Sequence, residues 1–339
     1  GIIFTGGAQN ATDDLSVTVS NSGEVSNTEL FIDAGNRFSD RNGTLRPLYR
    51  NVDLSFENTG QFTTAALTVL GKAENVRMDI VNRGAFAGPA ASFFGFGRTR
   101  VNDPIEWIAV NGAAPIAGTA SVRVANYADM SIENGDVNAT GYNMISASSS
   151  HDLDLENYGK ISFDFDIDSP RINGINVNQG ERYNQDTTDH EYNFDRLARI
   201  LNDGDISLNV ETGFQSSVAI SAEALSQINI TNNGQISLEN NFVEMPYFTA
   251  GIELSAFSDA MVNNDGAISV TNVSGLEANF GSIGIAFREV SLRQADAERL
   301  AASGDLGGYV RADDLTSVIT INLNAGDVTA NGTGSYGMF

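Results

Sequence analysis

The chain has 339 residues, a formal net charge of −24 and no cysteine. This acidity is unfavourable for nucleic acid, because phosphate binding needs clustered Lys and Arg side chains. The absence of cysteine excludes disulfides, iron–sulfur clusters and thiol nucleophiles. An apolar share of 41% is enough for a continuous core. No run approaches the roughly 18 apolar residues of a membrane-spanning helix, so we expect no membrane insertion of this segment.

A five-residue phrase, Asn-x-Gly-x-apolar, recurs along the whole chain. The bend residues of its regular copies are Asn21 and Gly23, Asn58 and Gly60, Asn82 and Gly84, Asn157 and Gly159, Asn202 and Gly204, Asn232 and Gly234, Asn264 and Gly266, and Asn324 and Gly326. A degenerate copy, NYADM at 126–130, has Ala128 in place of glycine. Recurrence at intervals of tens of residues indicates a repeat architecture.

Each copy of the phrase separates two predicted strands. Alternating apolar residues precede the bend, as Leu15, Val17 and Val19 do before Asn21, and this period of two predicts a half-buried strand. Asn and Gly tolerate the backbone conformations of a bend, and the apolar residue after Gly begins the next strand. A looser phrase, Gly followed by alternating apolar residues, predicts a further strand in each cycle, as at 174–177.

These bends recur at equivalent points in every cycle, with no hairpin-like Asn-Gly dipeptide joining two mirrored strands. They favour an all-β, parallel β-solenoid (a right-handed β-helix) of about 9–11 coils over a sandwich. The bend asparagines are expected to bond from coil to coil as a ladder. We expect one such segment over 1–339, as part of a longer chain.

Uneven spacing between the bends predicts insertions at about 29–50, 88–117, 178–200 and 288–310. The second contains the only tryptophan, Trp107, which is expected in a loop whose aromatic side chains cover one side of the rod. Residues 288–303 are expected to form a short amphipathic helix, and 194–201 one or two helical turns. Function usually resides in such excursions, since the rod itself is a scaffold.

Two alternating acidic sets are the candidate metal ligands. Asp164, Asp166 and Asp168 share one outward strand face, and Asp152, Asp154 and Glu156 share another one strand earlier. If these strands stack or flank each other, six carboxylates can approach a hard cation such as Ca²⁺. The alternative is an ordinary solvated strand face. No other cofactor is expected.

No residue pattern indicates catalysis, so we expect a protein that is not an enzyme. The two histidines, His151 and His190, lie in no metal-ligand spacing, and no Gly-x-Ser-x-Gly elbow is present. We expect both histidines on the surface or in loops. Paired carboxylates in a groove leave polysaccharide cleavage as an alternative.

The order strand, N-x-G-x-I, strand, G-I-x-V resembles the β-helical passenger regions of bacterial autotransporters and related large secreted surface adhesins. The resemblance covers nearly the whole chain outside the insertions. It implies an extracellular location at the surface of a Gram-negative bacterium and a role as an adhesin or display stalk, with a host, surface or polysaccharide ligand. Because the Gly phrase stands at both 1–4 and 337–339, a second hypothesis is the subunit of a filament or surface layer stacked end to end. A phage-tail-type solenoid is a third.

Overall fold

The computed structural model describes residues 2–4, 13–34, 37–39, 45–47, 49–89, 105–114, 118–133, 142–165, 171–184, 189–192, 196–210, 216–224, 226–240, 248–256, 259–272, 282–289, 319–323, 326–331 and 336–338. Every regular element in these ranges is a β-strand. The chain is an all-β parallel solenoid, which confirms the fold class expected from the repeats.

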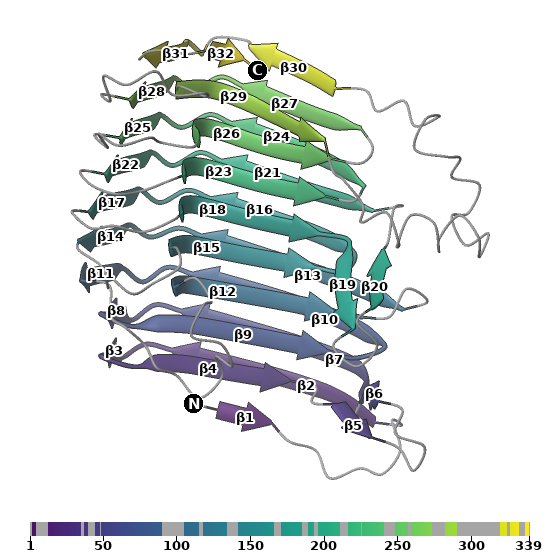
Figure 1. Cartoon of the computed structure of the whole chain (residues 1–339). Coiled ribbons are helices and arrows are strands. Elements are labelled where there is room, and N and C mark those ends of the chain that lie inside the picture. The colour runs from purple at the N-terminus through teal and green to yellow at the C-terminus, as the bar shows by residue number, and fades with distance from the viewer. Residues whose placement is uncertain are drawn as a thin grey trace.

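Three long sheets, here called A, B and C, make up the solenoid, and the strands within each are parallel (Figure 1). Sheet B contains β2 (Asp13–Asn21), β7 (Tyr49–Asn58), β10 (Asn75–Asn82), β13 (Thr119–Asn126), β16 (Asp152–Asn157), β21 (Leu197–Asn202), β24 (Gln227–Asn232), β27 (Ala260–Asn264) and β30 (Ile319–Leu323). Sheet C contains β3 (Glu24–Ser26), β8 (Gln61–Thr63), β11 (Phe86–Pro89), β14 (Met130–Glu133), β17 (Ile161–Phe165), β22 (Ile206–Val210), β25 (Ile236–Asn240), β28 (Ile268–Asn272) and β31 (Val328–Asn331). Sheet A contains β1 (Ile2–Phe4), β4 (Glu29–Ala34), β9 (Ala66–Lys72), β12 (Ile105–Ala113), β15 (Tyr142–Ser149), β18 (Arg171–Gln179), β23 (Ser216–Ala224), β26 (Phe248–Ala256), β29 (Ser282–Glu289) and β32 (Tyr336–Met338).

The chain visits the sheets in the order B, C, A and then begins the next coil. Sheets B and C have nine strands each, which define nine coils, and β1 adds a tenth strand to sheet A. Pairing is residue for residue: Asn82 of β10 lies between Asn58 of β7 and Asn126 of β13. Equivalent residues therefore recur at the strand spacing of about 4.8 Å along the axis.

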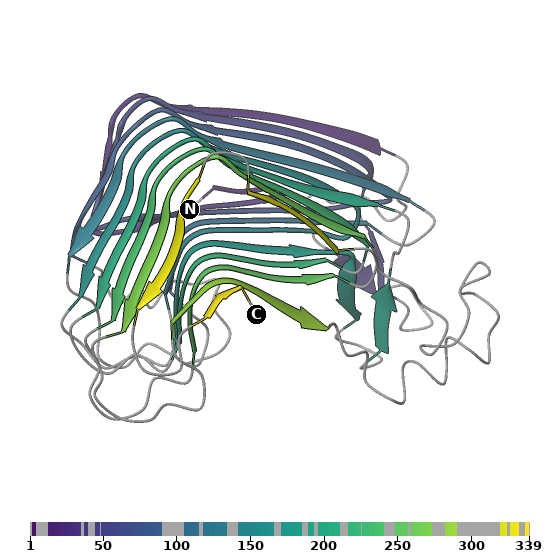
Figure 2. The same ribbon diagram turned by 90° about the horizontal axis from the view of Figure 1, so that it is seen from above.

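Sheet A is bent, as the view along the axis shows (Figure 2). Its first part runs beside sheet C and its second part beside sheet B, so the outer side of sheet A is concave. The core lies between the sheets and consists of stacked apolar columns. One column in sheet B is Val19, Phe56, Ile80, Val124, Leu155, Ile200, Ile230, Val262 and Ile321.

Trp107 lies in this core. It belongs to β12 and is only 3% exposed, so residues 105–113 of the expected 88–117 insertion are a coil strand. Its ring lies 6.0 Å from the rings of Tyr142 and of Phe163. The indole thus packs in the core between sheets A and C. Residues 90–104, between β11 and β12, lie outside the described residues.

The other insertions connect sheet A to sheet B. Residues 35–48 contain the antiparallel hairpin of β5 (Arg37–Ser39) and β6 (Leu45–Pro47), and 180–196 contain that of β19 (Glu181–Asn184) and β20 (Asp189–Tyr192). The helical turns expected over 194–201 are wrong, because β21 begins at Leu197 and buries Ala198 and Ile200 in the alternation of a strand. Of the helix expected over 288–303, residues 288 and 289 end β29 and the rest lies outside the described residues.

Candidate functional site

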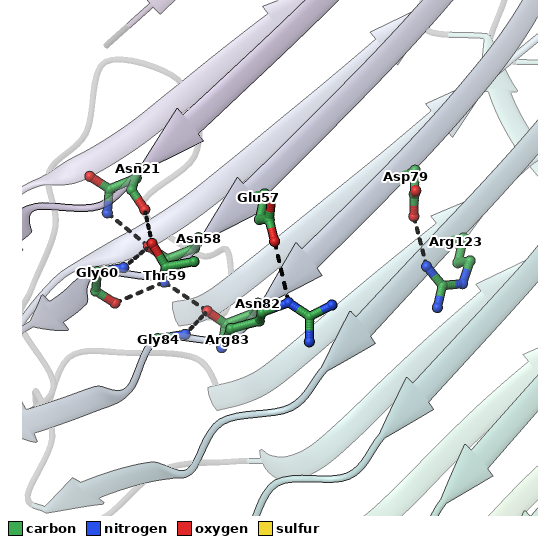
Figure 3. Close-up of polar contacts among 10 residues, drawn as sticks. All are labelled: Asn21, Glu57, Asn58, Thr59, Gly60, Asp79, Asn82, Arg83, Gly84 and Arg123. Carbon is green, nitrogen blue, oxygen red and sulfur yellow. Dashed lines mark hydrogen bonds and ion pairs between the residues drawn. The ribbon is translucent and has the colours of Figure 1, made fainter.

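The bend asparagines form one continuous ladder at the corner between sheets B and C. In each step the Nδ2 of one asparagine donates to the Oδ1 of the asparagine one coil on, at 2.7–2.8 Å. The ladder runs through Asn21, Asn58, Asn82, Asn126, Asn157, Asn202, Asn232 and Asn264. Its first steps are drawn in Figure 3. From Asn58 onward these side chains are buried, so the ladder satisfies amides that would otherwise be unpaired.

From Gly60 onward, close packing between coils requires the glycine of the bend. A Cβ built on Gly60 would lie 1.9 Å from the carbonyl oxygen of Gly23, and one on Gly204 would lie 2.0 Å from that of Gly159. Real Cβ atoms do not approach backbone so closely. In the coil with Ala128, Asn126 keeps its place in the ladder and donates to the Ala128 oxygen at 2.9 Å. The corner between sheets B and C is therefore structural. The last predicted bend residue, Asn324, lies outside the described residues, and Gly326 stacks on Gly266.

The structure places the two acidic sets in different sheets. Asp152, Asp154 and Glu156 lie in β16 of sheet B, whereas Asp164 lies in β17 of sheet C, beyond the Asn157 bend. Asp166 and Asp168 lie outside the described residues. Among the residues that are described, no three His, Cys, Asp or Glu side chains are grouped as a metal site would require.

The sheet B acids pair instead with arginines of neighbouring coils. Arg123 donates to Asp79 at 2.9 Å and to Glu156 at 2.8 Å, and Arg199 lies 3.7 Å from Asp154. Burial alone would lower the pKa of the Arg123 guanidinium, but its bonds to the two carboxylates raise it overall. These half-exposed pairs hold coil to coil on the outer face of sheet B, each with a small effect on stability.

His151 lies in the bend between β15 and β16, but it is buried rather than on the surface. Its Nδ1 is 3.0 Å from Ser150 Oγ, and its carbonyl oxygen accepts a bond of 2.7 Å from Gln179 Nε2. Ser226 then donates to Gln179 Oε1 at 3.0 Å. This chain of buried polar groups links consecutive coils at the corner between sheets A and B. His190 lies in β20 of the hairpin.

A ridge of exposed side chains runs beside the asparagine ladder, at the variable position of the Asn-x-Gly phrase. Tyr127 and Tyr158 stack in parallel there, with ring centroids 4.8 Å apart and an interplanar angle of 6°. The Arg83 guanidinium lies over the Tyr127 ring, 4.4 Å from its centroid. Neither tyrosine is among the site residues predicted from the sequence, although NYADM and NYGKI place them at one position of successive copies.

The concave outer face of sheet A carries a file of polar side chains that crosses several coils. Asn143 donates to Glu106 at 3.2 Å, and Asn173 donates to Asn143 at 2.7 Å. Arg171 continues the file by donating to Asn173 at 3.3 Å and to Ser221 at 3.0 Å. We call these residues, with Glu253, the polar file: Glu106, Asn143, Arg171, Asn173, Ser221 and Glu253.

The polar file, most of whose side chains are buried, adjoins a buried apolar patch on the same side of sheet A. In the strand pairing, Asn173 is followed by Val218, Ala250 and Ile283, which with Ala286 form a cluster separate from the main core. Glu253 lies between the two regions, 6% exposed, with Arg171 at 3.5 Å. Glu223 is its diagonal neighbour on β23, with a Cα separation of about 8 Å expected from strand geometry.

The corners of the solenoid differ in the length of the connections between their sheets. From β2 to β28, each step from sheet B to sheet C uses only the short Asn-x-Gly bend, or its Asn-x-Ala copy between β13 and β14. The long connections leave the ends of sheet A instead. The hairpins after β4 and β18 lie on the same side of the rod (Figure 1) and at the same end of the bent sheet (Figure 2). The outer face of sheet A is therefore the face that variable segments flank.

Comparison with family models, curated proteins and solved structures finds no match to this chain. Within the described residues, no helix is long and apolar enough to cross a membrane.

Proposed function

We propose that this protein is a rod-like adhesin or display stalk of a bacterial cell surface, and that it binds its ligand along the outer face of sheet A. The cell-surface location rests on the resemblance of the repeat phrase to autotransporter passenger regions. A host surface or a polysaccharide is the class of ligand that this proposal assigns.

The observation that supports this proposal is the difference between the corners. The corner between sheets B and C is filled by buried asparagines and glycines that admit little change. The hairpin segments 35–48 and 180–196 both leave the opposite side of the rod. Loops that vary on a rigid scaffold are where binding residues usually lie. A rod built in this way holds its loops in fixed order along its length.

The chemistry of the sheet A face suits an extended ligand. A row of exposed or partly exposed side chains offers amide, hydroxyl and carboxylate groups at successive coils of this face: Asn111, Ser148, Asn178, Glu223 and Ser255. A polymer of repeating units can follow such a row, since the protein groups themselves repeat at about 4.8 Å along the axis. The outer face of sheet B is less suitable, because its charges pair with one another.

Replacing one hairpin tests the proposal without disturbing the core. Residues 180–196 would be replaced by residues 225–226, which make the equivalent connection between β23 and β24. Attachment to host cells and to immobilised polysaccharides is measured for the variant and the native protein. We expect attachment to fall while the buried Trp107 keeps its native fluorescence. Unchanged attachment, repeated after the same replacement of 35–48, would count against this face.

The same assay separates binding from catalysis. Glu223 and Glu253 are diagonal neighbours on this face, and glycoside hydrolases use a pair of carboxyl groups. Binding without release of shorter sugars is the result expected of an adhesin. Release of sugars that stops in Glu253→Gln would replace the adhesin proposal by that of a polysaccharide hydrolase.

A second candidate is end-to-end assembly into a filament, and the outermost coils favour it. Of the seven partly buried apolar side chains that pack on the core within the described residues, six lie in the first or last coil. They are Leu15, Val19, Val25, Leu30, Ile321 and Val328. These edges fit a further solenoid coil, from a second copy or from more of the same chain. Electron microscopy should show rods longer than one molecule, lost in Val25→Lys and kept in Ser121→Lys. Single short rods with and without calcium would contradict it.

A further inference from the structure

We propose that Tyr127 and Tyr158 form an oxidative cross-linking site, at which a one-electron oxidant, here a peroxidase with hydrogen peroxide, joins the two rings as dityrosine. The proposal does not depend on the proposed function. It assigns to the exposed ridge a chemistry that the Asn-x-Gly repeat alone does not supply.

The first reason is the geometry of the pair. The rings are parallel within 6° and their centroids are 4.8 Å apart. Equivalent residues of adjacent coils are related by a translation along the axis, so like atoms of the two rings face each other. An ortho carbon of Tyr127 thus has an ortho carbon of Tyr158 as its neighbour.

The second reason is that the backbone holds both residues in place. The Tyr127 amide donates to the Asn82 oxygen at 2.7 Å, and the Tyr158 amide donates to the Asn126 oxygen at 2.8 Å. The buried asparagine ladder runs directly beside them. Fixing two reactants side by side raises their effective concentration far above that of free molecules. Coupling within the pair should therefore be faster than coupling between proteins.

The third reason is access. Tyr127 and Tyr158 are 40% and 39% exposed, whereas Tyr142 is fully buried and Tyr49 is 8% exposed. A haem peroxidase and its small diffusible oxidants reach only exposed phenols. Among the tyrosines whose exposure the structure describes, this pair alone combines access with a stacked partner.

Coupling begins with the one-electron oxidation of both phenols. Each phenol loses one electron and its hydroxyl proton and becomes a phenoxyl radical. The two radicals form a carbon–carbon bond between ortho carbons, and the hydrogen of each of these carbons then moves to the phenolic oxygen as the ring becomes aromatic again. The pair has lost two hydrogen atoms in all, and one hydrogen peroxide has been reduced to two waters.

The bond would connect the fourth and fifth coils. It closes a loop between positions 127 and 158, which restricts the unfolded chain in the way that a disulfide does. The chain has no cysteine and so no disulfide of its own. The cross-link should raise the thermal midpoint of unfolding.

The test treats the folded native protein with peroxidase and hydrogen peroxide and then cleaves it after Asp and Glu. Tyr127 and Tyr158 then fall in separate peptides, 107–129 and 157–164, each with a single tyrosine. We expect the two peptides joined, lighter by two hydrogen atoms, in monomeric protein, and formed at a rate that does not depend on protein concentration. Dityrosine fluorescence should appear with them.

Three matched variants complete the test. Tyr127→Phe and Tyr158→Phe should lose the joined peptides, and Tyr49→Phe should keep them. Native Trp107 fluorescence shows that each variant is folded. Oxidation should raise the thermal midpoint of the native protein but not that of Tyr158→Phe. The proposal is overturned if the joined peptides are missing from oxidised monomer, or if they occur only in dimers formed between molecules.

Discussion

Asn157 donates a hydrogen bond to Asn202 at 2.8 Å, although 45 residues separate them in the sequence. The same Asn157 Nδ2 also donates to the oxygen of Gly159 at 2.9 Å. One buried amide therefore fixes its own bend and bonds the next coil. Asn21, Asn58, Asn126 and Asn232 make the same two bonds, so local sequence and long-range stacking depend on the same side chains.

Asn202→Ala should be strongly destabilising. It leaves Asn157 Nδ2 and Asn232 Oδ1 buried without a ladder partner, and each unsatisfied buried group costs about 1–3 kcal/mol. Urea unfolding should show a loss of at least about 2 kcal/mol. The control is Asn233→Ala in the next bend. The exposed Asn233 side chain donates to Asp203, and its removal should lower the free energy of unfolding by no more than about 0.5 kcal/mol. Equal effects would contradict the ladder.

Gly204→Ala and Gly23→Ala should differ sharply, although they are the same change in the same phrase. In the sixth coil the new Cβ would meet the Gly159 oxygen at 2.0 Å, so the backbone must move. In the first coil the nearest atom to the new Cβ is Asn21 Oδ1 at 3.9 Å. We expect Gly204→Ala to lower the thermal midpoint by many degrees and Gly23→Ala to change it little. Circular dichroism measures both, and equal tolerance would mean that the coils are not packed so closely.

Trp107→Ala should cost about 3–5 kcal/mol, the usual range for deleting a buried aromatic ring. The indole packs against Tyr142 and Phe163, so the deletion leaves a cavity between sheets A and C. Trp107→Phe keeps part of the contact and should cost less. Urea unfolding followed by circular dichroism gives both values. A loss below about 1 kcal/mol for the Ala variant would place Trp107 outside the core.

Asp33 should make stability depend on pH. Burial raises the pKa of its carboxyl, and the nearby Lys72 ammonium opposes this shift only in part. A carboxyl whose pKa is raised in the folded state contributes most to stability at pH values below its unfolded-state pKa of about 3.9. This stability is lost as the pH rises through the folded-state pKa. Asp33→Asn should therefore be more stable than the native protein at neutral pH, with the difference shrinking toward pH 3. Thermal midpoints across this range test the sign, and the reverse trend would contradict it.

The bends and the strand alternation could be predicted from sequence because both are local. Asn-x-Gly specifies the bend, and a period of two specifies the buried side of each strand. Residues 197–202 show the limit of that reading. Leu, Ala and Arg suit helices in isolation, but pairing with β16 and β24 makes this segment a strand.

The site was harder to predict because it depends on how the coil turns. The acids of β16 and β17 are close in sequence, but the Asn157 bend sends them to different sheets. His151 is polar, yet it is buried because its corner is closed by hydrogen bonds to Ser150 and Gln179. The polar file of sheet A draws residues from coils far apart in sequence. Only the register of the coils brings them together.

Paired surface substitutions test whether ligand binding uses the outer face of sheet A. Asn111→Arg with Glu223→Arg places two guanidinium groups on that face, at positions that are exposed. Ser121→Arg with Gln227→Arg places the same two groups on exposed positions of sheet B. We predict that attachment to the host or polysaccharide surface falls at least about tenfold, or roughly 1.4 kcal/mol, for the sheet A pair and changes little for the sheet B pair. Equal attachment by both variants, or loss only in the sheet B variant, would contradict the account.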